Sequence, residues 1–343
     1  MKTISFIKAG LLALGLVTVF VVAWECYWRN CGFKVSYNDD EALWAYTRAM
    51  IYESSAARPV LIGSSRIKFD LDLNTWERIA GEKPIQLALE GTNPRPLLAD
   101  LANDPKFKGT IIMGVTEVLF FQPDHTHFEI QAEKRLKFYP HWPISQQAGF
   151  YLNKFLESNL LFLQENTFSL NALLKRLPIE SRPGVFVFPN FPLKFAQTQF
   201  DRQTSLTDDF VKSPEMQVQM QENWKKLAMQ PRAASGGDTL TGIIQSVKKD
   251  VDKIRSRGGE VVFLREPSNG PYLENEKQFY PRDKFWERLL KETGVVGIHY
   301  ADFPALSKYT CPEWSHLTPQ DAITFTQDLI PILEEKTGWK IKK

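Results

Sequence analysis

The chain has 343 residues, which is enough for one large domain or two small ones. Hydrophobic residues make up 43% of it and charged residues 24%, a balance typical of globular proteins. Its 42 basic and 40 acidic residues nearly cancel, so no overall charge favours nucleic acid as a partner. The three cysteines, Cys26, Cys31 and Cys311, exclude a disulfide framework, although a Cys26–Cys31 bridge is an open alternative in an oxidising compartment.

Residues 1–30 predict a membrane anchor. The run from Ala9 to Trp24 is uncharged and apolar, Lys2 and Lys8 precede it, and aromatic residues follow it. Lysines on the amino side favour a cytoplasmic N-terminus, which places the rest of the chain in the periplasm or at the cell surface. A cleaved signal peptide is the alternative, but bulky residues stand where a cleavage site needs small ones. We therefore expect one uncleaved transmembrane helix.

Residues 31–57 predict a juxtamembrane helix that begins after a polar cap at 37–40 and ends near residue 50. From residue 58 to residue 120, short apolar runs alternate with amphipathic stretches. Strands are expected at 60–62, 84–90 and 110–115, and helices at 73–80 and 96–102. Strands and helices in this alternation indicate parallel crossovers and an α/β fold.

The alternation stops between residues 121 and 237. Helices are expected at 151–163 and 170–177 and a strand at 184–188, with polar and proline-containing pieces between them. A stretch this long cannot be one loop in a compact domain, so we expect an inserted lid or cap subdomain.

The alternation resumes in residues 238–343. Helices are expected at 239–257, 285–291 and 319–335, and strands at 260–264 and 295–300. Together, 58–120 and 238–343 predict one α/β domain with a doubly wound, flavodoxin-like, five-stranded parallel sheet.

Residues suited to acyl transfer follow the strands. Ser65, Gly91 and Thr116 come after the first, second and third expected strands, and the carboxyl ends of parallel strands meet at one edge of a sheet. Near the other end of the chain, Glu313 precedes His316 by three residues. A serine becomes a nucleophile when a histidine takes its proton and a carboxylate orients that histidine. We therefore expect Ser65 as nucleophile, His316 as base and Glu313 as the orienting acid.

The same positions resemble the motifs of the SGNH hydrolase superfamily, also called GDSL esterases. The first motif matches Gly63-Ser64-Ser65, the second Gly91, the third Gly114-Val115-Thr116-Glu117 and the last Glu313-Trp314-Ser315-His316. The resemblance spans about 58–118 and 239–335. It implies an oxyanion hole formed by the N–H groups of Ser65 and Gly91 and by the side chain at position 116.

Two positions depart from the motifs of this superfamily. Thr116 stands where the superfamily has an asparagine that binds the oxyanion, and the loss of one such donor costs on the order of 10²–10³ in rate. Glu313 stands in place of aspartate, and its side chain is longer by one methylene but can still orient a histidine.

The anchor and the last motif together resemble the membrane-anchored branch of the superfamily. That branch includes proteins similar to polysaccharide O-acetyltransferases and to those that assist D-alanyl transfer to teichoic acid. The resemblance implies an extracytoplasmic esterase or O-acyltransferase that acts on an acylated cell-surface glycan or a small ester and needs no metal or organic cofactor. The alternative is a catalytically weak binding protein that assists a membrane-bound acyltransferase or a glycan-export complex, and Thr116 favours it.

Other residues allow further hypotheses. Arg66 follows the expected nucleophile and could bind an anionic substrate group or pair with Asp70 or Asp72. Arg265 leaves the fourth expected strand and could contact substrate or form a structural ion pair. The run 124–127 offers histidine and aspartate as metal ligands, but a solvent-exposed loop is the better interpretation.

Overall fold

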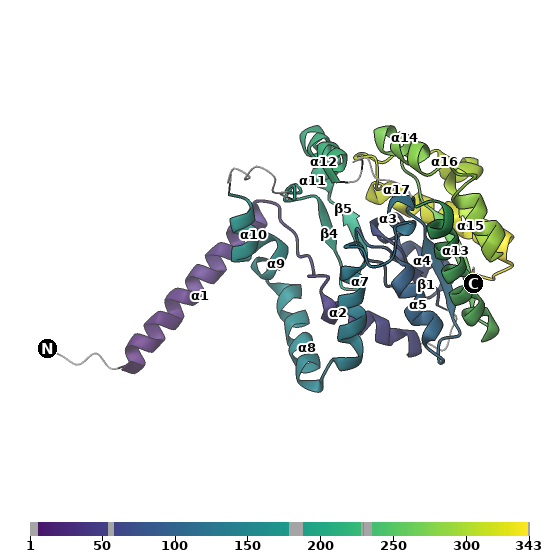
Figure 1. The fold of residues 1–343 in the computed structure, drawn as a ribbon. Coiled ribbons are helices and arrows are strands. Elements are labelled where there is room, and N and C mark those ends of the chain that lie inside the picture. Colours follow the sequence, from purple (N-terminus) through teal and green to yellow (C-terminus); the bar gives the residue numbers. More distant parts are fainter. Residues whose placement is uncertain (1–5, 54–57, 178–187, 228, 230–234, 342–343) are drawn as a thin grey trace.

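The computed structural model of the chain describes residues 6–53, 58–177, 188–227, 229 and 235–341 (Figure 1). It is an α/β structure with a five-stranded parallel sheet in the order β2-β1-β3-β6-β7. The strands are β1 (Val60–Ile62), β2 (Ile85–Gln86), β3 (Thr110–Gly114), β6 (Glu260–Arg265) and β7 (Val296–His299). The α/β class and the parallel sheet expected from the sequence are confirmed.

Helices cover both faces of this sheet, because its strands are apolar on both sides. Val60 and Ile62 belong to one hydrophobic core, and Leu61 between them belongs to the other. The first core is closed by α2 (Glu41–Ala49), α5 (Arg95–Asn103), α13 (Gly237–Ser256) and α15 (Trp286–Thr293). The second is closed by α3 (Ser65–Asp70), α4 (Leu73–Ala80), α16 (Pro304–Ser307) and α17 (Pro319–Thr337). The remaining short elements of these segments are η1 (Met50–Tyr52), α6 (Glu117–Phe120), α14 (Gly270–Phe279) and η4 (Tyr300–Asp302).

Residues between α6 and α13 add no described strand to the main sheet. Their elements are α7 (Ile130–Phe138), η2 (Tyr139–His141), α8 (Ile144–Asn159), η3 (Leu161–Leu163), α9 (Glu165–Phe168), α10 (Leu170–Lys175), β4 (Ala196–Thr198), β5 (Thr204–Leu206), α11 (Asp208–Lys212) and α12 (Pro214–Leu227). The strands β4 and β5 pair with each other in an antiparallel hairpin. We call residues 121–237 the insertion.

The helix expected at 151–163 has different bounds. It begins at Ile144, directly after Pro143, and ends at Asn159, and residues 161–163 form a separate 3-10 turn. The backbone N–H groups of Leu161 and Phe162 bind the carboxylate of Glu25 instead of continuing the helix. Residues 184–187 of the strand expected at 184–188 lie outside the described residues.

The N-terminal helix α1 (Phe6–Asn30) projects from the body of the molecule (Figure 1). Within the described part of the chain it is the one helix long and apolar enough to cross a membrane. Glu25 is its only buried residue. Cys26, Cys31 and Cys311 are free thiols, so the structure does not contain the Cys26–Cys31 bridge.

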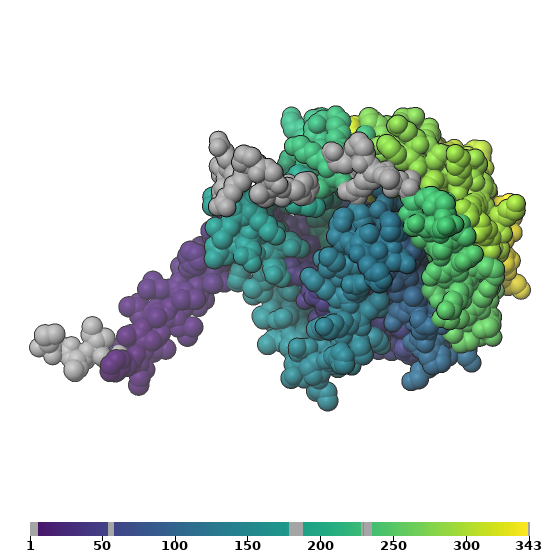
Figure 2. All heavy atoms as spheres, in the orientation of Figure 1, coloured from purple at the N-terminus to yellow at the C-terminus, as the bar shows by residue number. Residues whose placement is uncertain are grey.

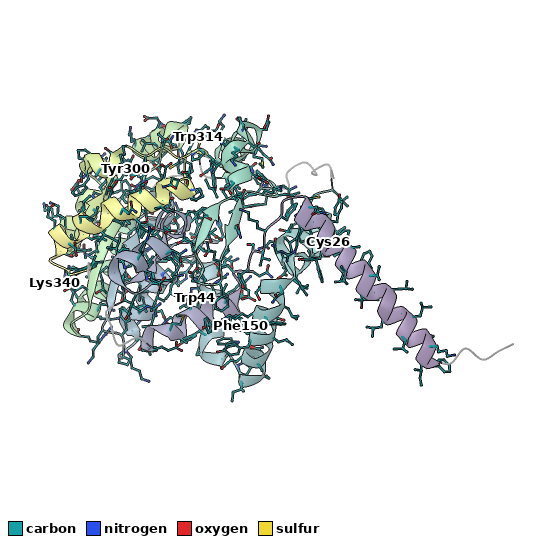
Figure 3. All side chains as sticks on the ribbon, turned by 180° about the vertical axis from the view of Figure 1, so that it is seen from behind. Cys26, Trp44, Phe150, Tyr300, Trp314 and Lys340 are labelled. Atoms are coloured by element: carbon teal, nitrogen blue, oxygen red, sulfur yellow. The ribbon has the colours of Figure 1, made fainter. Side chains whose placement is uncertain are left out.

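The juxtamembrane segment is joined to the α/β domain at α2. Asp40 caps this helix by accepting the N–H of Leu43 at 2.8 Å, as the polar run at 37–40 suggested. Trp44 is buried and donates its indole N–H to the carbonyl of Leu87 after β2. On the other side, Tyr46 contacts Phe150 of α8, and Figure 3 shows Trp44 and Phe150 on these neighbouring helices.

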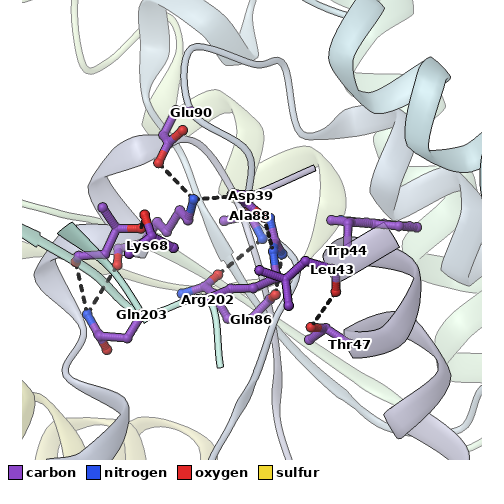
Figure 4. A network of polar contacts seen from close by, with 12 residues as sticks. Asp39, Leu43, Trp44, Thr47, Lys68, Gln86, Ala88, Glu90, Arg202 and Gln203 are labelled. Atoms are coloured by element: carbon purple, nitrogen blue, oxygen red, sulfur yellow. Dashed lines mark hydrogen bonds and ion pairs between the residues drawn. The ribbon is translucent and has the colours of Figure 1, made fainter. Parts of the chain in front are cut away.

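A cluster of four charged residues, of which Lys68 and Arg202 are fully buried, connects this segment to three other parts of the fold (Figure 4). The carboxylate of Asp39 binds Arg202, from the turn of the β4–β5 hairpin, at 2.6 and 2.9 Å and Lys68 of α3 at 2.5 Å. Lys68 also binds Glu90 at 2.7 Å, directly before Gly91. Burial alone would raise the pKa of Asp39, but the charges of Arg202 and Lys68 outweigh it and hold that pKa well below its usual value.

We predict that Asp39→Asn destabilises the protein by about 3–5 kcal/mol, because it leaves Arg202 and Lys68 buried without their main counter-charge. The matched control is Asp208→Asn, which removes an exposed carboxylate 3.4 Å from an exposed Lys34. It should change stability by less than about 0.5 kcal/mol. Denaturant unfolding of the full chain in detergent micelles measures both effects, and equal effects of the two variants would contradict the structural role of Asp39.

Candidate active site

A cavity of about 1450 Å³ lies between the insertion and the carboxyl ends of the strands. Ser65, Arg66, Gly91, Thr116 and His316 all line it, although they come from distant parts of the sequence. In Figure 2 a recess lies between the teal part of the insertion and the blue part of the molecule. The structure therefore brings most of the expected site residues to one cavity.

The exit of β1 presents Ser65 and hides Ser64. Gly63 has a φ of 156°, and a Cβ atom there would lie 2.6 Å from the Ile67 side chain and 3.2 Å from the Gly114 backbone. Only glycine allows this close approach between the ends of β1 and β3. The Ser64 hydroxyl is buried and bonded to the Thr116 hydroxyl at 2.7 Å. Ser65 begins α3, is partly exposed and lines the cavity.

Glu313 orients His316 through two contacts. Its Oε1 atom lies 2.8 Å from His316 Nδ1 and accepts the His316 backbone N–H at 2.6 Å. Trp314 between them has a φ of 78°, which turns the chain tightly enough for a residue to reach the third one after it. Glu313 is fully buried and His316 is 1% exposed. An acceptor at Nδ1 favours the tautomer that carries its proton there and leaves Nε2 as the basic atom.

The Nε2 atom of His316 is buried and has no hydrogen-bond partner among the described residues. The structure thus places Ser65 and His316 on one cavity but does not join them by a hydrogen bond. Catalytic hydrogen bonds are often long before substrate binds, and Nε2 of His316 is left as a buried nitrogen without a partner among the described residues.

Aromatic side chains surround the imidazole of His316. Phe69 of α3 stacks on it with ring centroids 4.3 Å apart, and Phe195 and Trp224 of the insertion lie at 6.2 and 5.9 Å. The indole N–H of Trp224 also donates a hydrogen bond to Glu313 Oε2. The insertion therefore completes the surroundings of the histidine and its acid. No local pattern in the sequence marks these three aromatic residues as part of a site.

The two other expected oxyanion donors are also on the cavity. Gly91 has a φ of 60°, a conformation that favours glycine, and a Cβ atom there would meet open space. Thr116 is 4% exposed, and its hydroxyl shares one hydrogen bond with Ser64 in which either oxygen can be the donor. When Ser64 donates, the Thr116 proton is free for another acceptor.

The two expected substrate-binding arginines share one carboxylate, that of Glu276 in α14. Arg66 lies 2.8 Å from Glu276 Oε1, and Arg265 lies 2.6 Å from Oε2. Arg265 also binds Glu117 at 2.7 Å and is not among the described residues that line the cavity. The expected pairing of Arg66 with Asp70 or Asp72 is wrong, because Glu276 takes that place. Arg66 lines the cavity but is 1% exposed.

Two further carboxyl groups, those of Asp70 and Glu266, are fully buried. Burial raises the pKa of Asp70 well above its usual value, while its Oδ1 accepts the N–H of Leu317 at 2.9 Å. Glu266, after β6, is fully buried, and neither of its oxygens has a hydrogen-bond partner among the described residues. Burial raises the pKa of Glu266 to about 7. A Cβ atom at Gly114 would lie 2.6 Å from Glu266 Oε1, so the carboxyl group needs glycine there.

One group of described residues has the geometry to hold a metal ion. The ligand atoms of His125, Glu129 and Glu133 lie within 4.8 Å of one another, whereas Asp124 pairs with Arg95. Glu129 already accepts hydrogen bonds from Asn93 and from the His125 backbone. Existing donors therefore satisfy the central carboxylate of this group without a metal. His127 lines the cavity instead.

Comparison of the chain with protein-family models gives no match, and comparison with curated proteins gives none either. The resemblance to the SGNH hydrolases therefore remains a prediction from four short motifs.

We predict that Glu266 makes stability depend on pH. Its pKa is about 7 in the folded protein, and an unfolded glutamate has a pKa of about 4.3, so the folded state binds more protons between these values. Stability should therefore fall by about 3 kcal/mol as pH rises from about 4.5 to about 7. Glu266→Gln should remove this part of the pH dependence, whereas Glu335→Gln at an exposed position should keep it. Denaturant midpoints at several pH values measure the slopes, and equal slopes for wild type and Glu266→Gln would contradict the prediction.

Proposed function

We propose that the protein is a membrane-anchored, serine-dependent acyl-transfer enzyme of the SGNH (GDSL-like) type, either an esterase or an O-acyltransferase. One observation carries the proposal: His316 is held at Nδ1 by a buried carboxylate, its Nε2 is buried without a partner among the described residues, and His316 and Ser65 line the same cavity. An imidazole held in this way suits a general base that acts on an alcohol of the same cavity.

The reaction runs in two halves. The Ser65 oxygen attacks the carbonyl carbon of an acyl ester while His316 Nε2 takes the hydroxyl proton, and Glu313 stabilises the resulting imidazolium. The tetrahedral intermediate collapses, His316 returns the proton to the leaving alcohol, and an acyl group remains on Ser65. Water then removes the acyl group in an esterase, or a sugar hydroxyl removes it in an O-acyltransferase. In both cases His316 accepts the proton of the attacking hydroxyl and returns it to Ser65.

In this reaction, three donors from the cavity hold the oxyanion. The Ser65 N–H is at the first position of α3, where no carbonyl of the helix can accept it. The left-handed conformation of Gly91 leaves its N–H at the cavity, and the Thr116 hydroxyl is a donor when Ser64 donates to it. A threonine hydroxyl has a shorter reach than an asparagine amide, so the oxyanion hole depends mainly on the two N–H groups.

The strand order supports a doubly wound, flavodoxin-like fold. Numbered along the chain within the main sheet, β2-β1-β3-β6-β7 becomes 2-1-3-4-5, the order of flavodoxin-like sheets. In such sheets ligands bind where the strand order reverses, outside the carboxyl ends of the first and third strands. Ser65 and Thr116 follow those two strands.

The anchor and the cavity suggest the location and the substrate. With α1 across a membrane and Lys2 and Lys8 on the cytoplasmic side, the catalytic domain lies in the periplasm or at the cell surface. The cavity of about 1450 Å³ is larger than the 300–1,000 Å³ usual for small ligands. An acylated glycan of the cell envelope suits such a cavity better than a small ester does.

The absence of a hydrogen bond between Ser65 and His316 favours a second candidate. In it, the protein keeps the fold, binds a glycan and assists a membrane-bound acyltransferase without turning over an ester itself. The threonine at position 116 is in line with this candidate, because it weakens the oxyanion hole.

We predict that a fluorophosphonate labels Ser65 and that the protein hydrolyses p-nitrophenyl acetate. Ser65→Ala and His316→Ala should each lower kcat by at least about 10³-fold, because either change removes the nucleophile and base as a working pair. Ser256→Ala, at an exposed serine of α13, is the control and should keep full activity. No label and no turnover in the wild type would reject the enzyme and support the binding protein.

We predict that Trp224→Phe lowers kcat by about tenfold to a hundredfold with little change in KM. A hydrogen bond to a charged group contributes about 1.5–3 kcal/mol, and Phe keeps the ring but removes the N–H that holds Glu313. Trp339→Phe is the matched control, since Trp339 makes the same kind of bond to the distant Glu260. Steady-state kinetics separate the two variants, and equal kcat values for both would show that Trp224 does not position Glu313.

A further inference from the structure

Helix α8 exposes an apolar stripe on one of its faces. Ile144, Tyr151, Leu152 and Phe155 are 83%, 55%, 60% and 66% exposed. Their spacing of seven, eight and eleven residues from Ile144 puts them on one side of a helix. Phe150 is the buried residue of α8, and it packs on Tyr46 and Phe200 of the body. The helix is therefore attached through one side and apolar on another.

The segment around α10 repeats this pattern. Leu170, Leu173, Leu174 and Leu177 are 71%, 43%, 49% and 53% exposed and have the spacing of a helical stripe. Asn171 and Lys175 of the same helix line the cavity. Here the polar side of the helix faces the cavity and the apolar side faces outward. For a protein surrounded by water, the opposite arrangement is the favoured one.

The two stripes are tied to the end of α1. Glu25 accepts the backbone N–H groups of Leu161 and Phe162 at 2.9 and 3.2 Å, and Arg29 donates to the Asn159 carbonyl at 2.9 Å. Trp28 of α1 contacts Phe168 of α9, with ring centroids 4.9 Å apart. The chain between α8 and α10 is thus bonded to the turn where α1 leaves its apolar stretch. Figure 1 shows α8, α9 and α10 on the side of the body from which α1 projects.

We propose that these two stripes are a lipid-contacting face that lies in the interface of the bilayer crossed by α1. This lipid face consists of eight residues: Ile144, Tyr151, Leu152, Phe155, Leu170, Leu173, Leu174 and Leu177. The inference rests on the proposed anchoring by α1, but not on the proposed chemistry at Ser65.

The bilayer is the occupant that the contacts favour. Because α1 holds the insertion at its own carboxyl end, a membrane that contains α1 lies next to α8 and α10 whatever else the protein binds. Amphipathic helices with a large apolar side and flanking cations lie in the plane of the interface. The exposed apolar stripes of α8 and of the segment around α10 meet the first of these two conditions.

The lipid face has a consequence for the site. Lys34, Gln164, Ser169 and Asn171 line the cavity close to the anchored end of the insertion. With the lipid face in the interface, this end of the cavity is next to the membrane surface. A substrate attached to the membrane can then enter the cavity and reach Ser65 while it stays attached.

Fluorescence quenching of the full chain in lipid vesicles tests the proposal. In a Cys26→Ser, Cys31→Ser background the buried Cys311 stays unlabelled, and single cysteines carry an environment-sensitive dye. Leu152→Cys and Leu173→Cys report the lipid face, Val17→Cys reports α1, and Lys248→Cys on α13 is the aqueous control. We expect nitroxide-labelled lipid to quench dyes at 17, 152 and 173 by about half or more, and iodide to quench only the dye at 248.

The other outcomes overturn the proposal in distinguishable ways. Lipid quenching at 17 but not at 152 and 173 keeps the anchor and rejects the lipid face. No lipid quenching at 17 rejects the anchor and the lipid face together, while ester hydrolysis reports separately on the site. In native membranes, dyes at 152 and 173 shielded from both quenchers would show that a protein covers the face instead. Each labelled variant should keep the unfolding midpoint of the unlabelled chain.

Discussion

The partly buried carboxylate of Asp39 is the contact on which the arrangement of the molecule depends most. It lies between Arg202 of the insertion and Lys68 of the helix that begins at Ser65. Lys68 in turn binds Glu90, next to Gly91 of the proposed oxyanion hole. The buried charges of Arg202 and Lys68 are stable only when they have partners, so these ion pairs join the segment before α2, helix α3 and the insertion.

The insertion contributes to the site and to the surface at the same time. On its inner side, Trp224 and Phe195 complete the surroundings of His316 and its acid. On its outer side, α8 and α10 expose leucine and aromatic side chains next to α1. Both sides are explained if the insertion covers a site that works at a membrane surface. The cavity between the insertion and the sheet is then the route from that surface to Ser65.

Local pattern predicted the features that depend on neighbouring residues. Apolar runs bounded by glycine and proline predicted the strands, and a spacing of three residues predicted the contact between Glu313 and His316. Helix bounds shifted where distant groups compete, as at Leu161, whose N–H binds Glu25 of α1. The doubly wound arrangement, the anchor topology and the roles of the site residues remain predictions.

Contacts between residues far apart in the sequence could not be predicted, because local pattern carries no information about them. Arg66 was expected to pair with an aspartate a few residues away, but Glu276 of α14 takes that place and binds Arg265 as well. Nothing in the residues around Trp224 distinguishes it from other aromatic residues, and its contact with the site follows only from the bond to Glu313. Contacts of this kind are decided by which surfaces the folded sheet brings together.

In the proposed reaction, Ser65 carries the acyl group between the two halves. Mass spectrometry of the protein, quenched in acid within the first turnover of p-nitrophenyl acetate and digested, can detect this acyl group. We expect one acetyl group, located at Ser65, that forms with the release of p-nitrophenol and then disappears. Turnover without an acetyl group at Ser65, or an acetyl group that forms equally in the His316→Ala variant, would contradict it.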